Sequence, residues 1–160
     1  PSVAGGRPHR HCVHLSIMTK SILLTTLLLI ATAGAASAAP AAYLTIDHSS
    51  QAVMDKATAQ AIWKEHLPDD LTRRLLKLYP SGKYGFFSQV EGGFTESKLC
   101  VVTARAMMLP RAGKVLQAVP QKTTTTFDAQ PNLTAAQCQD LAKAKLREAV
   151  SALVSPLVAR

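Results

Sequence analysis

The sequence lacks the motifs by which most enzymes and cofactor-binding proteins are recognised. It contains no G-x-G-x-x-G or Walker pattern, so it predicts no phosphate-binding loop. No two cysteines form a C-x-x-C pair, which disfavours a thioredoxin-like redox site. His48 and His66 have no third ligand at a suitable spacing, whereas metal sites need three or four ligands. We therefore predict no catalytic residue, no cofactor and no metal, and hence no enzyme.

The sequence also lacks long runs of residues with the same charge. No run of five or six like charges occurs, and the basic residues are not interleaved with aromatics, so we expect no nucleic-acid partner. Residues 39–160 carry 15 Lys and Arg against 10 Asp and Glu, a net charge of +5. A mild positive charge favours solubility and loose attraction to anionic partners such as envelope polymers.

A hydrophobic run long enough to span a membrane is also missing. The apolar stretch from Ile22 to Ala33 has 12 residues, whereas a span needs about 20. Lys20 precedes this stretch, and the small residues Ala36-Ser37-Ala38 follow it as an A-x-A cleavage signature. The pattern predicts a signal peptide over residues 18–38, cleaved after Ala38. We expect a periplasmic or secreted protein without a stable membrane span.

The remaining chain divides into two parts. Residues 1–17 precede Met18 and show no apolar periodicity, so we interpret them as an upstream extension that is not native to the protein. They contain a cluster that would otherwise indicate a metal site: His9, His11, Cys12 and His14. Residues 39–160 are predicted to form a single mature α+β domain.

Apolar periodicity predicts the elements of that domain. Helical spacing follows the cap residues Ser49 and Ser50 and predicts a helix over residues 51–66. A second helix begins at Asp69 and stops at Pro80. The period then changes to two and predicts strands over residues 84–91, 98–109 and 115–119, with extended structure again over 123–127.

Turns and caps complete the predicted order. Gly92-Gly93 and residues 110–113 indicate tight turns between the strands. Thr134 and Gln137 form a capping box that begins a final helix, which Pro156 ends or kinks. The order ααβββα predicts a small antiparallel three-stranded meander with the helices packed against it.

Two cysteines remain after the predicted cleavage, Cys100 and Cys138. An even number in an exported chain is most simply one disulfide, although two unpaired buried thiols are the alternative. Alternation places small and apolar residues on one face of the central strand: Cys100, Val102, Ala104, Ala106 and Met108. Cys138 lies in the first turn of the final helix, so the bond would tie that helix across the sheet.

The opposite face of the central strand is the candidate binding face. It is half apolar with an arginine at its centre: Leu99, Val101, Thr103, Arg105 and Met107. Exposed apolar patches are uncommon on small monomers, which favours coverage of this face by the two N-terminal helices. The functional interpretation is an open sheet face that binds a partner, because apolar groups around an arginine are typical of interface hot spots.

These observations favour a non-enzymatic module that binds another macromolecule. An inhibitor, an immunity protein or an envelope-assembly factor would fit, with an envelope or secreted protein as partner. A small-ligand carrier is the first alternative, and it requires a pocket of roughly a few hundred cubic ångströms between sheet and helices. A small hydrolase that uses His48 or His66 with distant partners is the second.

Overall fold

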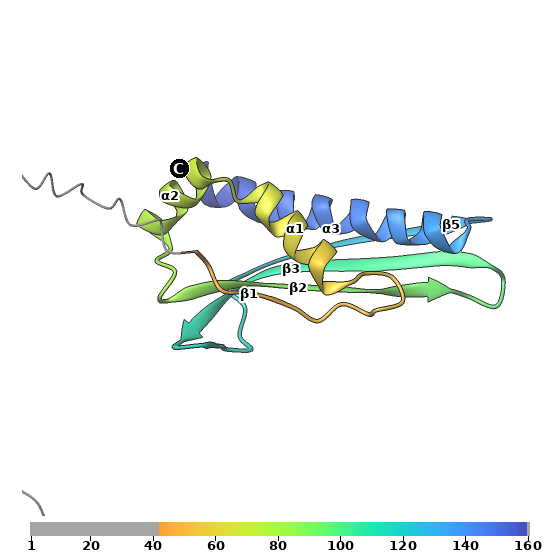
Figure 1. The fold of residues 1–160 in the computed structure, drawn as a ribbon, viewed down its shortest axis with the longest axis horizontal. Helices are drawn as coiled ribbons and strands as arrows, with labels where there is room; N and C mark the ends of the chain where they lie inside the picture. The colour runs from red at the N-terminus through yellow and green to blue at the C-terminus, as the bar shows by residue number, and fades with distance from the viewer. Residues whose placement is uncertain (1–41, 160) are drawn as a thin grey trace, which may run out of the picture. The chain divides into compact units, whose positions relative to one another are not determined.

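The computed structural model describes residues 42–159, which form an α+β domain (Figure 1). Its elements in chain order are β1 (Thr45–Asp47), α1 (Lys56–His66), α2 (Asp69–Leu78), β2 (Tyr84–Phe94), β3 (Leu99–Ala112), β4 (Val115–Leu116), β5 (Lys122–Pro131) and α3 (Ala135–Val158). The predicted extension over residues 1–17 and the predicted signal peptide over 18–38 lie outside the described residues.

The sheet is more elaborate than the predicted three-stranded meander, which is wrong in two respects. Five strands are present in the described residues, in the order β1-β2-β3-β5, with β4 paired to the end of β3. β1 runs parallel to β2, while β2, β3 and β5 are antiparallel neighbours. A parallel neighbour requires a crossover connection, and here α1 and α2 supply it.

The predicted turn at Gly92-Gly93 is also wrong, because both glycines lie inside β2. The chain reverses further on, where the Thr95 N–H donates to the Leu99 carbonyl at 2.9 Å. Gly92 has φ +157°, and a Cβ there would collide with the Val101 carbonyl oxygen. The glycine therefore allows β2 to pass close to β3 within the sheet.

The strands after β3 also differ from the prediction in length. The predicted strand over 115–119 shortens to β4, which returns from β3 through a turn at Gly113 with φ +61°. The extended structure predicted over 123–127 is the middle of β5. β5 pairs with β3 along its whole length and so completes the sheet.

The helices follow the sequence signals with two corrections, at the start of α1 and at Pro156, which does not end α3. α1 begins at Lys56 rather than near Gln51, because the Asp55 carboxylate caps it by accepting from the Thr58 N–H at 2.8 Å. α2 lies where predicted. In α3 both hydrogen bonds of the Thr134–Gln137 capping box are present, at 3.3 and 2.8 Å. α3 continues through Pro156 to Val158.

The helices of the described residues all lie on one side of the sheet (Figure 1). Beneath them the predicted face of β3 is buried, with 0–1% exposure at Cys100, Val102, Ala104, Ala106 and Met108. The predicted disulfide is confirmed: Cys100 and Cys138 are bonded, with 5.9 Å between their Cα atoms. This bond ties α3 to the central strand, and no helix of residues 42–159 packs on the other face of the sheet.

Candidate functional site

The candidate binding face lies on the side of the sheet away from the helices. Arg105 is exposed and its neighbours Leu99, Val101, Thr103 and Met107 are half-buried. The expectation that the two N-terminal helices cover this face is wrong. Ile62 and Trp63 of α1 and Leu75 of α2 belong instead to the core on the other side. We call this side of β3, with its cross-strand neighbours, the open face.

Cross-strand pairing extends the open face over β2 and β5. Arg105 lies between Gln89 of β2 and Thr125 of β5. The row on one side of Arg105 is mainly apolar and consists of Phe87, Met107 and Thr123. The row on the other side is mixed and consists of Glu91, Thr103 and Phe127. Phe127 is 62% exposed. The arginine therefore stands between two rows that each carry an aromatic ring.

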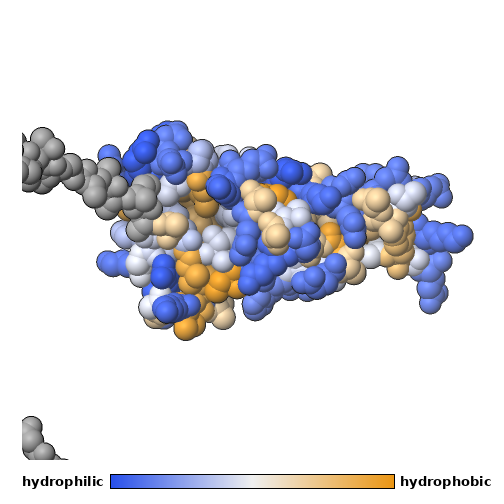
Figure 2. All heavy atoms as spheres, in the orientation of Figure 1, coloured by the Kyte–Doolittle hydropathy of each residue, from blue (hydrophilic) through white to orange (hydrophobic). Residues whose placement is uncertain are grey.

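One end of the open face is closed by the chain itself. A Cβ added to Gly85 of β2 would be 2.6 Å from Leu116 of β4, so β4 lies over this end of the sheet. Hydrophobic residues gather at the surface near β4 (Figure 2), where Val115 is 65% exposed. At the β1 edge the His48 ring packs edge-on to Phe87, with centroids 5.1 Å apart. The accessible part of the face is thus centred on Arg105.

The charges of the open face are available to a partner. Within residues 42–159 the salt bridges all involve α3, and none involves Arg105. The Gln89 amide donates to the Glu91 carboxylate at 2.6 Å and holds it beside the arginine row. An unpaired guanidinium next to apolar surface is suited to a carboxylate on another molecule.

A buried polar network on the helix side was not predicted. The Trp63 indole N–H donates to the Ser88 hydroxyl at 3.0 Å, and that hydroxyl donates to the Asp47 carboxylate at 2.7 Å. The Ser49 hydroxyl donates to the same carboxylate at 2.8 Å. The sequence signal that could have predicted the network is Ser88, a polar residue at a position of β2 where the alternation expects an apolar one. The network joins α1 to β1 and β2.

His48 and His66, which the hydrolase hypothesis would use, do not join this network. The His48 ring lies against Phe87 on the open face, although its neighbours Asp47 and Ser49 contact each other. His66 Nδ1 lies 3.0 Å from the Ile62 carbonyl of its own helix. Among residues 42–159 no group of three His, Cys, Asp or Glu side chains is placed to hold a metal ion. The cluster from His9 to His14 lies outside the described residues.

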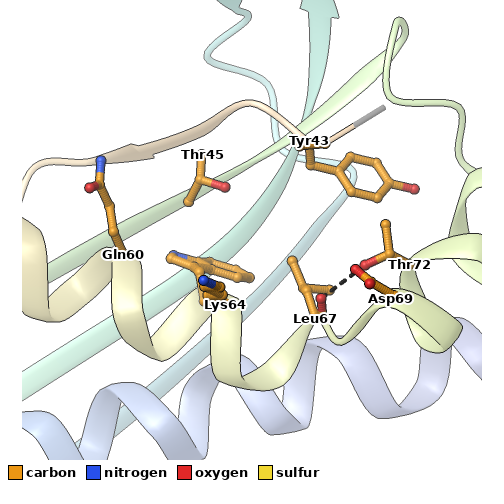
Figure 3. A pocket seen from close by; sticks show the side chains of 9 residues that line it. Tyr43, Thr45, Gln60, Lys64, Leu67, Asp69 and Thr72 are labelled. Atoms are coloured by element: carbon orange, nitrogen blue, oxygen red, sulfur yellow. Dashed lines mark hydrogen bonds between the residues drawn. The ribbon is translucent and has the colours of Figure 1, made fainter. Parts of the chain in front are cut away.

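A pocket of about 460 Å³ opens between the segment that leads into β1 and the two N-terminal helices (Figure 3). Its lining residues are Ala42, Tyr43, Thr45, Gln60, Trp63, Lys64, Leu67, Asp69 and Thr72. The rings of Trp63 and Tyr43 both pack on Phe86, at 5.0 and 4.9 Å between centroids. The Tyr43 hydroxyl donates to the Tyr79 carbonyl at 2.5 Å, and burial raises the pKa of Tyr43 to about 12. The wall is therefore aromatic and carries both a cation and an anion.

Comparison with known proteins adds no assignment: the chain matches no family model, and no curated protein matches it. In the part of the chain that the structure describes, no helix is both long and apolar enough to cross a membrane.

Proposed function

We propose that this chain is an exported, non-enzymatic module that binds another protein through the open face. The observation that carries the proposal is the side of β3 that no helix of residues 42–159 covers, where Arg105 is exposed and lies between two rows that each carry a phenylalanine. The N-terminal pattern over residues 18–38 supports export. The disulfide fits an oxidising compartment, because such bonds are rare in the cytosol.

The chemistry of the face indicates the kind of partner. Arg105 would pair with a carboxylate, and Met107 and Phe127 would contact apolar groups around it. A few residues near the centre of an interface account for most of its binding energy, and arginine and aromatic residues are enriched among them. An envelope or secreted protein with an acidic residue inside an apolar patch would match. A purely anionic polymer would contact the charge of Arg105 but not the apolar side chains around it.

A matched pair of charge reversals tests the proposal. Arg105→Glu reverses the charge at the centre of the open face, and Arg73→Glu makes the same change on exposed α2. We expect Arg105→Glu to weaken capture of the specific partner from envelope extract at least about tenfold, because the change opposes like charges across the interface. Arg73→Glu should bind as the unaltered protein does. Equal capture by both variants would refute the assignment of the open face.

Mass spectrometry of the protein recovered from an exporting host tests the compartment. The expected mass is that of a chain that starts at Ala39 with its two cysteines bonded. A chain that retains residues 22–38 and stays in the cytosol would exclude export.

The pocket supports a second candidate function, a small-ligand carrier. Its volume of about 460 Å³ falls within the range of known ligand sites, about 300–1,000 Å³. Lys64 and Asp69 could orient a polar molecule with an apolar ring against the aromatic wall. The Trp63 fluorescence would report binding, since the chain contains one tryptophan. A ligand whose affinity falls in Lys64→Glu but not in Arg105→Glu would favour the carrier.

A further inference from the structure

The outer edge of β5 has its own pattern of free backbone groups. The Arg111 N–H donates to the Lys83 carbonyl, so the odd-numbered residues of β3 direct their backbone groups toward β2. The even-numbered ones direct theirs toward β5, where they pair with even-numbered residues. Thr123, Thr125 and Phe127 therefore direct both N–H and C=O away from the sheet.

This free stretch has defined ends. The next outward N–H, that of Ala129, is taken by the Asp128 carboxylate at 2.7 Å. At the other end the Gln121 N–H donates to the Met108 carbonyl at 2.9 Å and is not free. Among residues 42–159, the donors left without a partner on this edge are therefore those of residues 123, 125 and 127, which are symmetric about Thr125.

Between Lys122, which begins β5, and Pro131, which ends it, the stretch 123–127 lacks the devices that usually prevent strand addition. Its register with β3 is unbroken from Lys122 to Pro131, so no bulge twists the edge away. No proline or charged residue occurs from Thr123 to Phe127. Natural edge strands are commonly protected by such features, and an edge without them is a template for another strand. The alternative is that these four threonines form an ordinary edge strand whose backbone groups are hydrogen-bonded to water.

We propose that β5 pairs with β5 of a second copy of this chain, antiparallel, with Thr125 opposite Thr125. In this register Thr123 lies opposite Phe127 of the other copy, and every free donor meets a free acceptor. Phe127 then packs beside a threonine on the open face, a favourable aromatic and β-branched pair.

The charges select the same register independently. Thr125 opposite Thr125 places Lys122 opposite Asp128, and the symmetry repeats this pair. Lys145 of the same chain already lies 3.7 Å from the Asp128 carboxylate, so Lys122 would be its second cation. Both residues lie on the helix side of β5, at non-hydrogen-bonded positions, where facing side chains are closest. The two adjacent registers in which the outward backbone groups still face each other place Lys122 opposite Thr126 or Gln130. Only the proposed register joins opposite charges.

This pairing would join the two sheets into one, with both open faces on the same side. It does not rest on the proposed function, because the contacts lie at the edge of β5 and not at Arg105. A dimer without a partner protein, or a partner bound by a monomer, would separate the two proposals.

Sedimentation of the purified, disulfide-bonded protein over a range of concentrations tests self-association. We expect a monomer–dimer equilibrium. Thr125→Pro removes the central outward N–H, which an edge strand tolerates, and should raise the dimer dissociation constant about tenfold or more. Lys122→Glu should raise it about threefold to tenfold by opposing Asp128. Circular dichroism and Trp63 fluorescence confirm that each variant remains folded.

Cysteine pairing tests the register. Residues at a hydrogen-bonded antiparallel pair have Cα atoms about 5.5 Å apart, within disulfide range. Thr125→Cys should therefore link two copies under mild oxidation. Thr123→Cys should not, because its two copies would lie about 13 Å apart along the strands. A protein that stays monomeric at every concentration, a dimer that Thr125→Pro leaves intact, or a Thr123→Cys link that forms as readily as the Thr125→Cys link would overturn the proposal.

Discussion

The two faces of the sheet are built from alternate residues of the same strands, yet they have different surroundings. Ala106 is fully buried beneath the helices, while Arg105, one residue earlier, is exposed. The helix side of β3 carries only small and apolar residues, as packing requires. The open face mixes apolar, hydroxyl and charged groups, and its central residue Arg105 is exposed. The helix side thus forms the core of the domain, and the open face is the surface through which we propose that the protein binds its partner.

Among the changes to the helix side, loss of the disulfide should lower the free energy of unfolding the most. Replacing both Cys100 and Cys138 with Ala frees two elements separated by 38 residues. The chain-entropy argument predicts a loss of about 4 kcal/mol in the free energy of unfolding. Urea titration measures it. A loss below about 1 kcal/mol would mean that α3 is held mainly by packing.

Enlarging neighbouring residues of β3 compares the two faces directly. Ala106→Leu adds volume to a packed core and should cost about 3 kcal/mol of unfolding free energy. Arg105→Leu, on the open face, should change it by no more than about 0.5 kcal/mol. Urea titration of both variants checks the difference. Similar costs would show that the open face is packed as well.

Ser88 gives a smaller contrast with its neighbour Gln89. Ser88→Ala leaves the buried Trp63 N–H without an acceptor, and such a loss costs about 2 kcal/mol. Gln89→Ala on the open face should be nearly neutral. A shift of the Trp63 emission in Ser88→Ala but not in Gln89→Ala would confirm that the network holds α1 in position on the sheet. Equal stability of the two variants would argue that the network contributes little.

Tyr43 adds a pH dependence to the helix side. Burial raises the pKa of Tyr43 from its ordinary 10.0 to about 12, so the folded state favours the neutral phenol. The stabilisation is complete below pH 10 and is lost as the pH rises toward 12. We expect unfolding titrations to show a decline over this interval that is smaller in Tyr43→Phe. The same decline in both proteins would assign it to other groups.

Much of the fold follows from the sequence where one local signal decides the structure. The alternation around Cys100 predicted the buried face of β3 and its bond to Cys138. The capping box at Thr134 placed the start of α3. β1 was missed because three residues are too few to show a period of two, and its parallel pairing depends on a distant strand. Gly92 was misplaced because glycine marks turns and close strand contacts alike.

The candidate site could be predicted only in part, for a different reason. Alternation placed Arg105 and Met107 on one face, but the side on which α1 and α2 pack depends on the whole core. Whether this face is exposed could therefore be learned only from the three-dimensional structure. The network of Asp47, Ser49, Ser88 and Trp63 joins three separate elements, which no local pattern reports.

Site-specific photo-crosslinking in the cells that make the protein tests the role of the open face most directly. A photoreactive residue at Arg105 or at Gln89 beside it would probe this face, and one at Ser151 would probe the exposed side of α3. The account predicts a link to one specific envelope or secreted protein from the open-face positions and none from Ser151. Links from Ser151 alone, or equally from all three positions, would contradict it.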